Sequence, residues 1–467
     1  MYDVDVVVVG GGLSGVGAAL GAARNGAKTL VIERSGYLGG WLRGVGLGSN
    51  LAISAPGWRP ALNEGVLLDI TRGVIAAGME GHPNLEAVLE RGDLRVANHE
   101  IIPHVFQDLV IESGAQILYF STYSDSIVKG NKIDAVIVET PVGRGAIRGK
   151  MFIDCTGLAT VAAESGSPVR TEEAYMGLQA WITGVDRARF EEYDKSIPDP
   201  EKPSPEARSW LEAKLGHPIT HFSPDRPDSM NFPWDDWLTR NANVLGPKFR
   251  EAVDRGEMPL FYRVGEKGVV SWVEGLKVDS YEISGPIARP RTYVVGVDPT
   301  DIRAVSEAHV KSTQYLFALV RFLNKNIPGF EKAQITRMSE MTLNRAGRSI
   351  ENEMTPPTGS DISKHIEHDD AIAILQRGKD RGAYEVPYRA MVPEKVDNLL
   401  AVGKSSVGGL RYRTHMLSVI MGQAAGTAAA IAVRDGTTAR DVNIRKVQAQ
   451  LRKDGVAIPD KLQKAIE

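Results

Sequence analysis

Residues Val4–Val9 read VDVVVV, and the chain continues through Gly10–Gly15 as GGGLSG. The first stretch is a short, β-branched and nearly continuous apolar run, which is typical of a buried parallel strand. The second has the spacing Gly-x-Gly-x-x-Gly. Residues 14–25 (SGVGAALGAARN) are small and alanine-rich, so they favour a helix packed closely on a sheet, and Gly26 is placed to end it. This order of strand, glycine-rich turn and helix predicts a dinucleotide-binding unit.

Each part of this unit has a physical task. Gly10 permits the tight turn, Gly12 lets the backbone approach a pyrophosphate, and Gly15 lets helix and strand pack closely. The helix N-terminus offers N–H groups and a positive dipole end to the phosphates. A second strand at 28–32 (KTLVI) is followed by Glu33, whose carboxylate can accept both ribose hydroxyls and disfavours a 2′-phosphate.

A second glycine-rich stretch, residues 143–149 (GRGAIRG), serves as a test of this reasoning. One strand precedes it (IDAVIVET), but another strand (KMFIDCTG) follows it where a helix would be needed. It is therefore predicted to be a hairpin turn. Without a second Gly-x-Gly-x-x-Gly in a β–α–β setting, a separate NAD(P)H domain is not expected.

Three further segments distinguish the kind of dinucleotide. Glu33 is followed by a basic residue and the Gly39-Gly40 pair, which resembles the N-terminal signature of FAD oxidoreductases. Residues 152–157 (FIDCTG) resemble their late (I/V)-D-A-T-G strand, whose Thr-Gly turn approaches the FAD, and the strand edge near Tyr123 resembles the segment that borders the adenine. In residues 397–431, a strand ends at Gly403 and a small-residue helix carrying GQAAG follows.

In flavoproteins of this kind, that closing helix points its positive end at the flavin N1–C2=O edge, where negative charge develops on reduction. The chain thus resembles the broad FAD-dependent oxidoreductase family, with fumarate-reductase-like and ketosteroid-dehydrogenase-like proteins as distant cousins. It departs from many members at Lys404, where they have arginine, and at Leu158, where they have an acid. The resemblance implies FAD as cofactor and a cofactor site made of Gly10, Gly12, Leu13, Ser14, Gly15, Glu33, Arg34, Gly40, Trp41, Arg43, Tyr123, Thr156, Gly157, Gly403, Met416 and Leu417.

The expected fold is α/β, a Rossmann-type FAD-binding domain with an inserted mixed α+β substrate or cap domain. The FAD-binding domain is expected at 1–167 plus 385–467, and the insertion at 168–384. Within the insertion, tryptophans such as Trp234, Trp237 and Trp272 are either core residues or an aromatic wall for an apolar substrate. Residues 301–326 have helical spacing with Asp301 at the N-terminus, which predicts a packing helix whose His309 is not catalytic.

The turn before the closing helix reads Arg411-Tyr412-Arg413-Thr414-His415 and holds the catalytic candidates. Oxidation by flavin needs a substrate C–H aimed at N5 and often a base. His415 is the best candidate for that base, since its ordinary pKa lies near neutrality. Arg413 could hold a substrate oxygen, the flavin C2=O charge or a structural carboxylate, and Arg411 and Tyr412 are further catalytic candidates. Weaker candidates for anion binding are Arg43, Arg345 and Arg348, and a structural role is expected for Tyr388 and Arg389.

Composition narrows the function classes. The formal net charge is -3 and no block of five like charges occurs, so a nucleic-acid partner is not expected. Cys155 is the one cysteine, which excludes a CxxC redox pair or an iron–sulfur site within the chain.

No stretch approaches eighteen uninterrupted apolar residues, so no membrane span is expected, and a strand beginning at Val4 leaves no room for a targeting peptide. A cytoplasmic location is the resulting expectation. Residues 365–370 (HIEHDD) are expected to form a solvated polar face and no metal site.

The leading functional hypothesis is a dehydrogenase or oxidase that oxidises a small organic substrate by hydride transfer to flavin N5. One alternative is an FAD monooxygenase that uses NAD(P)H and oxygen. Another is a flavin-binding subunit of a larger complex whose partner performs the chemistry. The electron acceptor stays open among oxygen, a quinone and a protein, and the chain can be a homo- or a hetero-oligomer.

Overall fold

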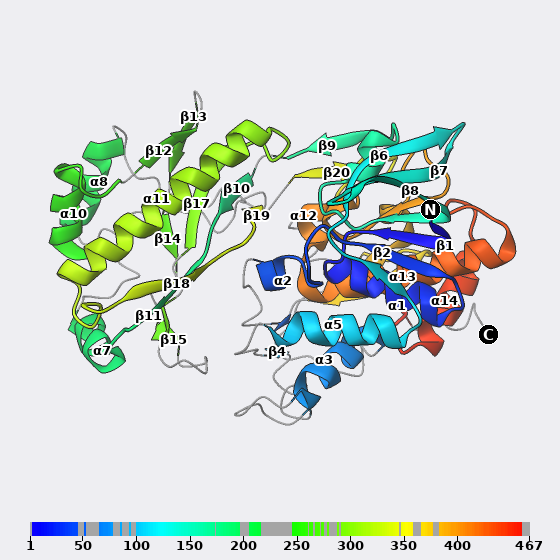
Figure 1. Cartoon of the computed structure of the whole chain (residues 1–467), viewed down its shortest axis with the longest axis horizontal. Coiled ribbons are helices and arrows are strands. Elements are labelled where there is room, and N and C mark those ends of the chain that lie inside the picture. Colours follow the sequence, from blue (N-terminus) through cyan, green and yellow to red (C-terminus); the bar gives the residue numbers. More distant parts are fainter. Residues whose placement is uncertain are drawn as a thin grey trace. The chain divides into compact units, whose positions relative to one another are not determined.

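The computed structural model divides the chain into two compact units (Figure 1). Unit 1 comprises Met1–Thr171 and Gly347–Glu467, and unit 2 comprises Glu172–Ala346. The residues that the structure describes are 2–44, 51–52, 65–77, 85, 93–94, 100–172, 174–196, 205–215, 245–259, 261–264, 267–270, 272–274, 278–279, 287–288, 291–344, 347–357, 366–376 and 383–459.

A parallel sheet forms the centre of unit 1. Its strands lie in the order β5 (Gln116–Leu118), β2 (Thr29–Ile32), β1 (Tyr2–Val9), β8 (Gly143–Asp154) and β23 (Leu399–Ala401). The other edge of β8 is shared. Its second half pairs with β23, and its first half pairs antiparallel with β7 (Lys132–Thr140), which in turn pairs with β6 (Thr122–Lys129). The carboxyl ends of β1, β2, β8 and β23 therefore meet at one edge, where α/β sheets bind ligands.

Both faces of this sheet are covered, as the continuous apolar run of β1 predicts. Val6 and Val8 belong to the core on one face, and Val7 and Val9 belong to the core on the other. The helices on the first face include α1 (Leu13–Arg24), α5 (Ile101–Glu112) and α13 (His415–Asp435) (Figure 1). Successive strand residues point to opposite faces, so residues 6–9 of β1, which are buried on both faces, are all apolar.

The helix α13 is long and apolar enough to cross a membrane by length and composition, with a mean hydropathy of 1.7. It lies in the core of unit 1, where 94% of its most apolar 18-residue stretch is buried, and it packs mainly against α1. Core helices of globular proteins have these properties as well.

The remaining elements of unit 1 are short. On the second face lie α6 (Thr160–Glu164) and the paired strands β9 (Val169–Thr171) and β20 (Arg348–Ile350). The hairpin β21 (Ala371–Gln376) and β22 (Ala383–Pro387) contributes to the same core as α13. The others are α2 (Trp41–Gly44), β3 (Leu51–Ala52), α3 (Val66–Ala76), β4 (Asp93–Leu94), η4 (Tyr388–Met391), η5 (Gly403–Ser405), α12 (Gly409–Tyr412) and α14 (Ile444–Lys453).

Unit 2 is mixed α+β, as expected for the insertion. Its two larger sheets are antiparallel, β14-β17-β10-β19 and β15-β16-β11-β18, beside the hairpin β12–β13. Their bounds are β10 (Ala174–Gly177), β11 (Ala180–Thr183), β12 (Phe261–Val264), β13 (Lys267–Val270), β14 (Trp272–Glu274), β15 (Val278–Asp279), β16 (Ile287–Ala288), β17 (Arg291–Val297), β18 (Gln334–Met338) and β19 (Leu343–Asn344). The helices are α7 (Arg187–Ser196), α8 (Pro205–Leu215), α10 (Gly246–Asp254) and α11 (Ile302–Asn326).

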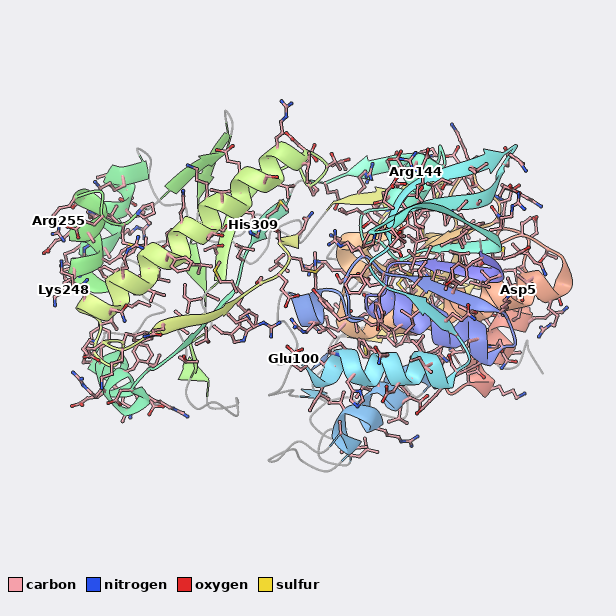
Figure 2. All side chains as sticks on the ribbon, viewed as in Figure 1. Asp5, Glu100, Arg144, Lys248, Arg255 and His309 are labelled. Atoms are coloured by element: carbon pink, nitrogen blue, oxygen red, sulfur yellow. The ribbon has the colours of Figure 1, made fainter. Side chains whose placement is uncertain are left out.

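The predicted helix at 301–326 is α11. The Asp301 side chain accepts hydrogen bonds from the N–H groups of Arg303 and Ala304, so it caps the helix. His309 lies on this helix (Figure 2), with its Nδ1 3.3 Å from the hydroxyl oxygen of Thr342. Trp234 and Trp237 lie outside the described residues, as does the side chain of Trp272.

Two boundaries differ from the sequence-based expectation. The hairpin around residues 143–149 is present, but its turn lies between Thr140 and Gly143, and 143–149 is the first part of β8. Residues 168–171 and 347–384, which the sequence-based expectation places in the insertion, belong to unit 1. The reason is local pairing, since β20 joins β9 and the β21–β22 hairpin joins the core around α13.

Candidate functional site

In the turn after β1, a Cβ atom could be added without a close contact at Gly12 but not at the other glycines. A Cβ atom on Gly10, whose φ is +104°, would lie 2.6 Å from the carbonyl oxygen of Cys155, and one on Gly15 would lie 1.8 Å from the carbonyl oxygen of Gly10. These two glycines are required by the packing of the turn itself. A Cβ on Gly12 would meet nothing within 4 Å. Gly12 is also the N-cap residue of α1 and has no side chain with which to cap it, so among the described residues the N–H groups of the first turn suit an anion.

Glu33 joins two loops at this edge. Its side chain is buried, with 7% of its surface exposed. One carboxylate oxygen accepts from the N–H of Gly11 at 2.8 Å and the other accepts from the N–H of Ser35 at 2.7 Å. Each oxygen has a second lone pair, so the predicted bonds to ribose are compatible with these contacts. Arg34, the next residue, is exposed.

The Gly39-Gly40 segment lies against the same turn, as the resemblance implies. The Gly39 N–H donates to the carbonyl oxygen of Gly11 at 2.8 Å. A Cβ on Gly40, whose φ is +51°, would lie 3.1 Å from the Cα of Gly12. Arg43, in the short helix that follows, is engaged elsewhere. It forms an ion pair with Glu100 at 2.8 Å and lies 5.0 Å from the ring centroid of Tyr37.

Asp154 organises the turn after β8. It is wholly buried, and one carboxylate oxygen accepts from the Thr156 N–H at 3.0 Å, the Thr156 hydroxyl at 2.7 Å and the Ser405 hydroxyl at 3.2 Å. Its other oxygen accepts from the Ala162 N–H at 3.1 Å. Burial raises the pKa of Asp154, and these hydrogen bonds oppose that shift. The network fixes Thr156 and Gly157, and our sequence reasoning did not select Asp154 although the motif contains it.

Two further predicted contacts lie on either side of this turn. Gly403, whose φ is +62°, follows β23, and a Cβ there would lie 2.5 Å from the Ser14 hydroxyl oxygen. The end of β23 therefore touches the start of α1. Tyr123 lies on β6, with its hydroxyl 2.8 Å from that of Ser126, and burial raises its pKa. Its predicted contact with adenine stays a prediction.

Lys404 is half-buried at the point where these loops converge. Its Nζ lies 4.5 Å from the ring centroid of Trp41, a cation–π contact. A Cβ on Gly157 would lie 3.5 Å from its Cε. Burial, and next the charge of Arg413, lower the pKa of Lys404 to about 7. Sequence reasoning noted this lysine only as a departure from the family, although a cation inside the predicted cofactor set was a usable signal.

The predicted catalytic turn precedes α13, which begins at His415 with Thr414 as its N-cap. Tyr412 lies in the core, wholly buried, with its hydroxyl 2.8 Å from that of Tyr384, and burial raises its pKa. This position favours a packing role for Tyr412 over a catalytic one. The side chain of Arg411 lies outside the described part of the chain. Arg413 and His415 are half-buried.

Met416 and Leu417, in the first turn of α13, belong to the buried core of unit 1. Their side chains are therefore used in packing, and a cofactor would be reached through their backbone N–H groups. The N-cap residue Thr414 makes no side-chain hydrogen bond to this helix end, and Gly12 makes none at the start of α1.

The other polar candidates have structural partners. Arg348 donates to the carbonyl oxygen of Leu158 at 3.1 Å, and Arg345 lies outside the described residues. Arg389 pairs with Asp370, and the Tyr388 hydroxyl donates to the Ala439 carbonyl at 2.7 Å. These contacts agree with the structural role expected for both. Among the described residues no group of three or more His, Cys, Asp or Glu could hold a metal ion, and His365 is not among them.

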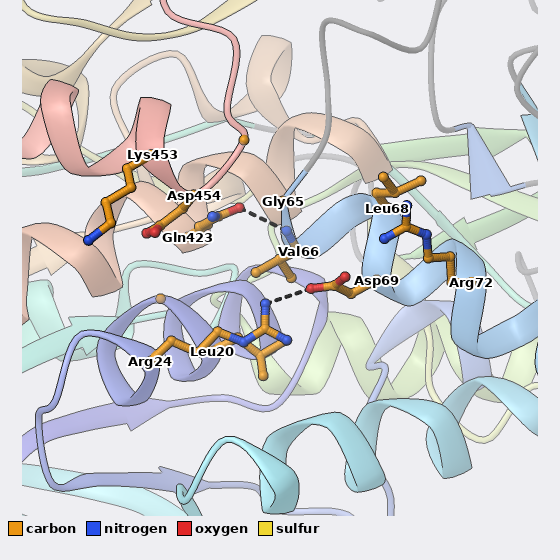
Figure 3. Close-up of a pocket in the computed structure, with 12 residues that line it drawn as sticks. Leu20, Arg24, Gly65, Val66, Leu68, Asp69, Arg72, Gln423, Lys453 and Asp454 are labelled. Atoms are coloured by element: carbon orange, nitrogen blue, oxygen red, sulfur yellow. Dashed lines mark hydrogen bonds and ion pairs between the residues drawn. The ribbon is translucent and has the colours of Figure 1, made fainter.

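A surface pocket of about 350 Å³ lies beside α1, α3 and α14 (Figure 3). Within it, the Val66 N–H donates to the side-chain oxygen of Gln423 at 3.1 Å, and Arg24 pairs with Asp69 at 2.6 Å. None of the predicted cofactor or catalytic residues is among those that line it. The pocket marks where α3 is attached to α1 and α13.

The geometry of the sheet edge agrees with a comparison of sequences. The profile of the family described as FAD dependent oxidoreductase matches residues 5–451. The chain belongs to this family. Its residues fit the cofactor, since the space at Gly12 and the uncapped start of α1 suit a diphosphate, and Glu33 stands at the end of the next strand. The predictions of an FAD-dependent oxidoreductase and of its Rossmann-type fold are thereby confirmed.

Curated relatives include the thiamine thiazole synthase of Methanococcus vannielii, 31% identical over 166 residues, which are 34% of this chain and 57% of that protein. The synthase of Aeropyrum pernix is 30% identical over 156 residues, 33% of this chain and 50% of that protein. The chain thus spans little more than half the length of these relatives.

Similar solved structures include a geranylgeranyl bacteriochlorophyll reductase-like protein from Thermoplasma acidophilum, at a TM-score of 0.43 and 14% identity, covering 100% of this chain and 91% of that one. Another is p-nitrophenol 4-monooxygenase from Pseudomonas putida, at a TM-score of 0.41 and 13% identity, covering 100% and 89%.

Proposed function

We propose that this flavoprotein is a dehydrogenase or oxidase that removes a hydride and a proton from a small organic substrate. The observation that carries the proposal is the position of His415 as the first residue of α13, one residue beyond Thr414 and two beyond Arg413. This helix end comes after β23 and after Gly403, where a Cβ would lie 2.5 Å from the Ser14 hydroxyl oxygen at the start of α1. These positions support a base and a cation beside the cofactor-binding edge.

FAD supplies a two-electron acceptor when it is bound. The chain's own residues perform the other tasks. The turn around Gly12 and the start of α1 bind the diphosphate, and Glu33 accepts from the ribose. His415 takes the substrate proton at a ring nitrogen, because a histidine side chain exchanges protons near neutral pH. Arg413 holds a substrate oxygen and so orients the C–H bond that breaks.

The direct test is anaerobic titration of the purified yellow protein with a panel of small organic substrates while the flavin absorbance is followed. One substrate class should bleach the flavin. His415→Ala should slow this bleaching by about 10²-fold or more while FAD stays bound. A matched control is His104→Ala, which removes a surface histidine paired with Asp108. Bleaching of His415→Ala at the normal rate would overturn the assignment of the base.

Other outcomes of the same titration decide the competing functions. Rapid bleaching by NADPH, with none by the panel, would replace the proposal with a monooxygenase. Activity found only in a co-purified complex would replace it with a subunit whose partner performs the chemistry. Repetition in air separates an oxidase from a dehydrogenase that passes electrons to a quinone or a protein. A cytoplasmic location and a homo- or hetero-oligomeric state remain part of the proposal.

A further inference from the structure

We propose that Lys404 sets the reduction potential of the bound FAD, because its ammonium group stabilises the negative charge that the cofactor gains on reduction. The inference deepens the proposed function by naming a residue that tunes electron acceptance. It rests on FAD binding in unit 1 and is independent of the identity of the substrate and of the role of His415.

The ammonium end of the lysine lies close to two of the loops that we assign to the cofactor site. The ammonium group lies over the Trp41 ring, next to the Gly39-Gly40 segment, at 4.5 Å. A Cβ on Gly157 would lie 3.5 Å from its Cε. A Cβ on Gly409 would lie 2.0 Å from its carbonyl oxygen, so position 409 has no room for a side chain. Lys404 thus lies close to three separate segments of unit 1.

The charges around Lys404 are mainly positive. η5 packs with α12, α13 and β20, and ends at Ser405 beside Asp154. The charged and titratable residues on these elements are Arg411 and Tyr412 on α12, Arg413 just before α13, His415 at the start and Arg434 and Asp435 at the far end of α13, and Arg348 on β20, with Asp154 at the end of β8. Arg413 is the group that acts on the charge of Lys404. The Asp154 carboxylate is already bonded to Thr156, Ala162 and Ser405.

This arrangement couples protonation of Lys404 to reduction. Burial and the positive charge of Arg413 both disfavour the ammonium form, so the pKa of Lys404 is lowered to about 7. Negative charge arriving nearby favours the ammonium form and raises that pKa. Lys404 therefore has one pKa when FAD is oxidised and a higher pKa when FAD is reduced. At a pH below both values, the lysine is charged in both redox states and raises the reduction potential. At a pH between the two values, reduction of FAD brings a proton onto Lys404, and at a pH above both the lysine is neutral and does not change the potential.

The experiment measures the reduction potential of bound FAD against pH, from pH 6 to pH 10, by equilibration with reference dyes. In the wild type, the reduction potential should fall more steeply with pH from about pH 7 upward, by the slope that corresponds to one additional proton taken up on reduction. Lys404→Arg should keep the high potential without this steeper segment, since arginine stays charged. Lys404→Met should lower the potential at pH 6, equivalent to about tenfold or more in the reduction equilibrium constant, and should meet the wild-type curve at high pH.

A purely structural role, in which Lys404 only steadies Trp41, predicts a different result. Lys404→Met would then weaken FAD binding or lower the melting temperature and leave the wild-type potential and its pH profile in place, which would overturn the proposal. If the methionine variant does not fold, Lys404→Arg decides, because persistence of the steeper segment in it also contradicts the proposal. Lys150→Met, which removes a surface lysine paired with Asp5, is the matched control and should leave the curve unchanged. No substrate is used, so failure here is distinct from failure of the proposed function.

Discussion

Gly422 on α13 lies against Ser14 on α1, so closely that a Cβ at position 422 would be 2.2 Å from the Ser14 carbonyl oxygen. The contact is reciprocal, because a Cβ on Gly17 of α1 would be 2.3 Å from the carbonyl oxygen of Val419. The two helices therefore touch backbone to backbone. This contact holds the start of α13, with His415, at a fixed place relative to the turn that binds the diphosphate.

Gly422→Ala should separate these helices. The added methyl group meets backbone that cannot rotate away, so we expect a loss of about 3 kcal/mol in the free energy of unfolding and a weaker affinity for FAD. Chemical denaturation of the apoprotein measures the first effect and FAD titration the second. Gly145→Ala is the control, because a Cβ there would be at an ordinary 3.7 Å from Val138. Equal stability of the two variants would contradict the backbone contact.

The parts of the site that could be predicted from sequence depend on local spacing. The apolar run of β1 and the glycines that follow it specify a strand, a turn and a helix start within a few residues, so their structure follows from their neighbours in sequence. Glu33 was predicted for the same reason, because the length of a β–α–β unit fixes where the second strand ends.

The unpredicted parts depend on contacts between distant segments. Nothing in the sequence near Lys404 shows that Trp41 will lie beneath its ammonium group, since the two residues meet only when α2 and η5 reach the same edge of the sheet. Tyr412 was selected as catalytic because its neighbours in sequence are polar. Its hydroxyl instead meets Tyr384 in the core, a contact that depends on the β21–β22 hairpin packing near α13.

The Tyr384–Tyr412 hydrogen bond gives a test of that packing role. Tyr412→Phe removes one buried hydroxyl and leaves the other without this bond, which should cost about 1 kcal/mol in the free energy of unfolding. The double variant Tyr384→Phe, Tyr412→Phe should recover part of that loss, because both hydroxyls of the pair are then removed together. Urea unfolding of the wild type, the single variants Tyr384→Phe and Tyr412→Phe, and the double variant gives the coupling energy. Loss of flavin reduction by substrate in Tyr412→Phe, with stability unchanged, would restore Tyr412 as a catalytic candidate.

The stability of unit 1 should also depend on His368. Its Nδ1 is 2.8 Å from the Arg389 guanidinium, and burial, with this neighbouring charge, lowers its pKa from the ordinary 6.5. The folded chain therefore disfavours the protonated ring. As pH falls below 6.5, the unfolded chain takes up a proton that the folded chain does not, so stability should fall until the pH passes the lowered pKa.

Denaturation of the wild type and of His368→Gln between pH 5 and pH 8 measures this effect. The wild type should lose stability relative to the variant as the pH is lowered through 6.5, while the difference should be constant at pH 7 and above. A difference that does not change with pH would show that His368 has the same pKa in the folded and unfolded chains.

The most direct test of the central claim is calorimetric titration of the apoprotein with FAD, in the wild type and in Gly12→Ala. The backbone at Gly12 has φ −73° and ψ −170°, which any residue adopts, and its Cβ would meet nothing within 4 Å. We predict one FAD per wild-type chain, and in Gly12→Ala an affinity lower by about tenfold or more with the free energy of unfolding of the apoprotein unchanged within about 1 kcal/mol. Equal affinity in the two proteins, or a folded wild type that binds no FAD, would contradict the account.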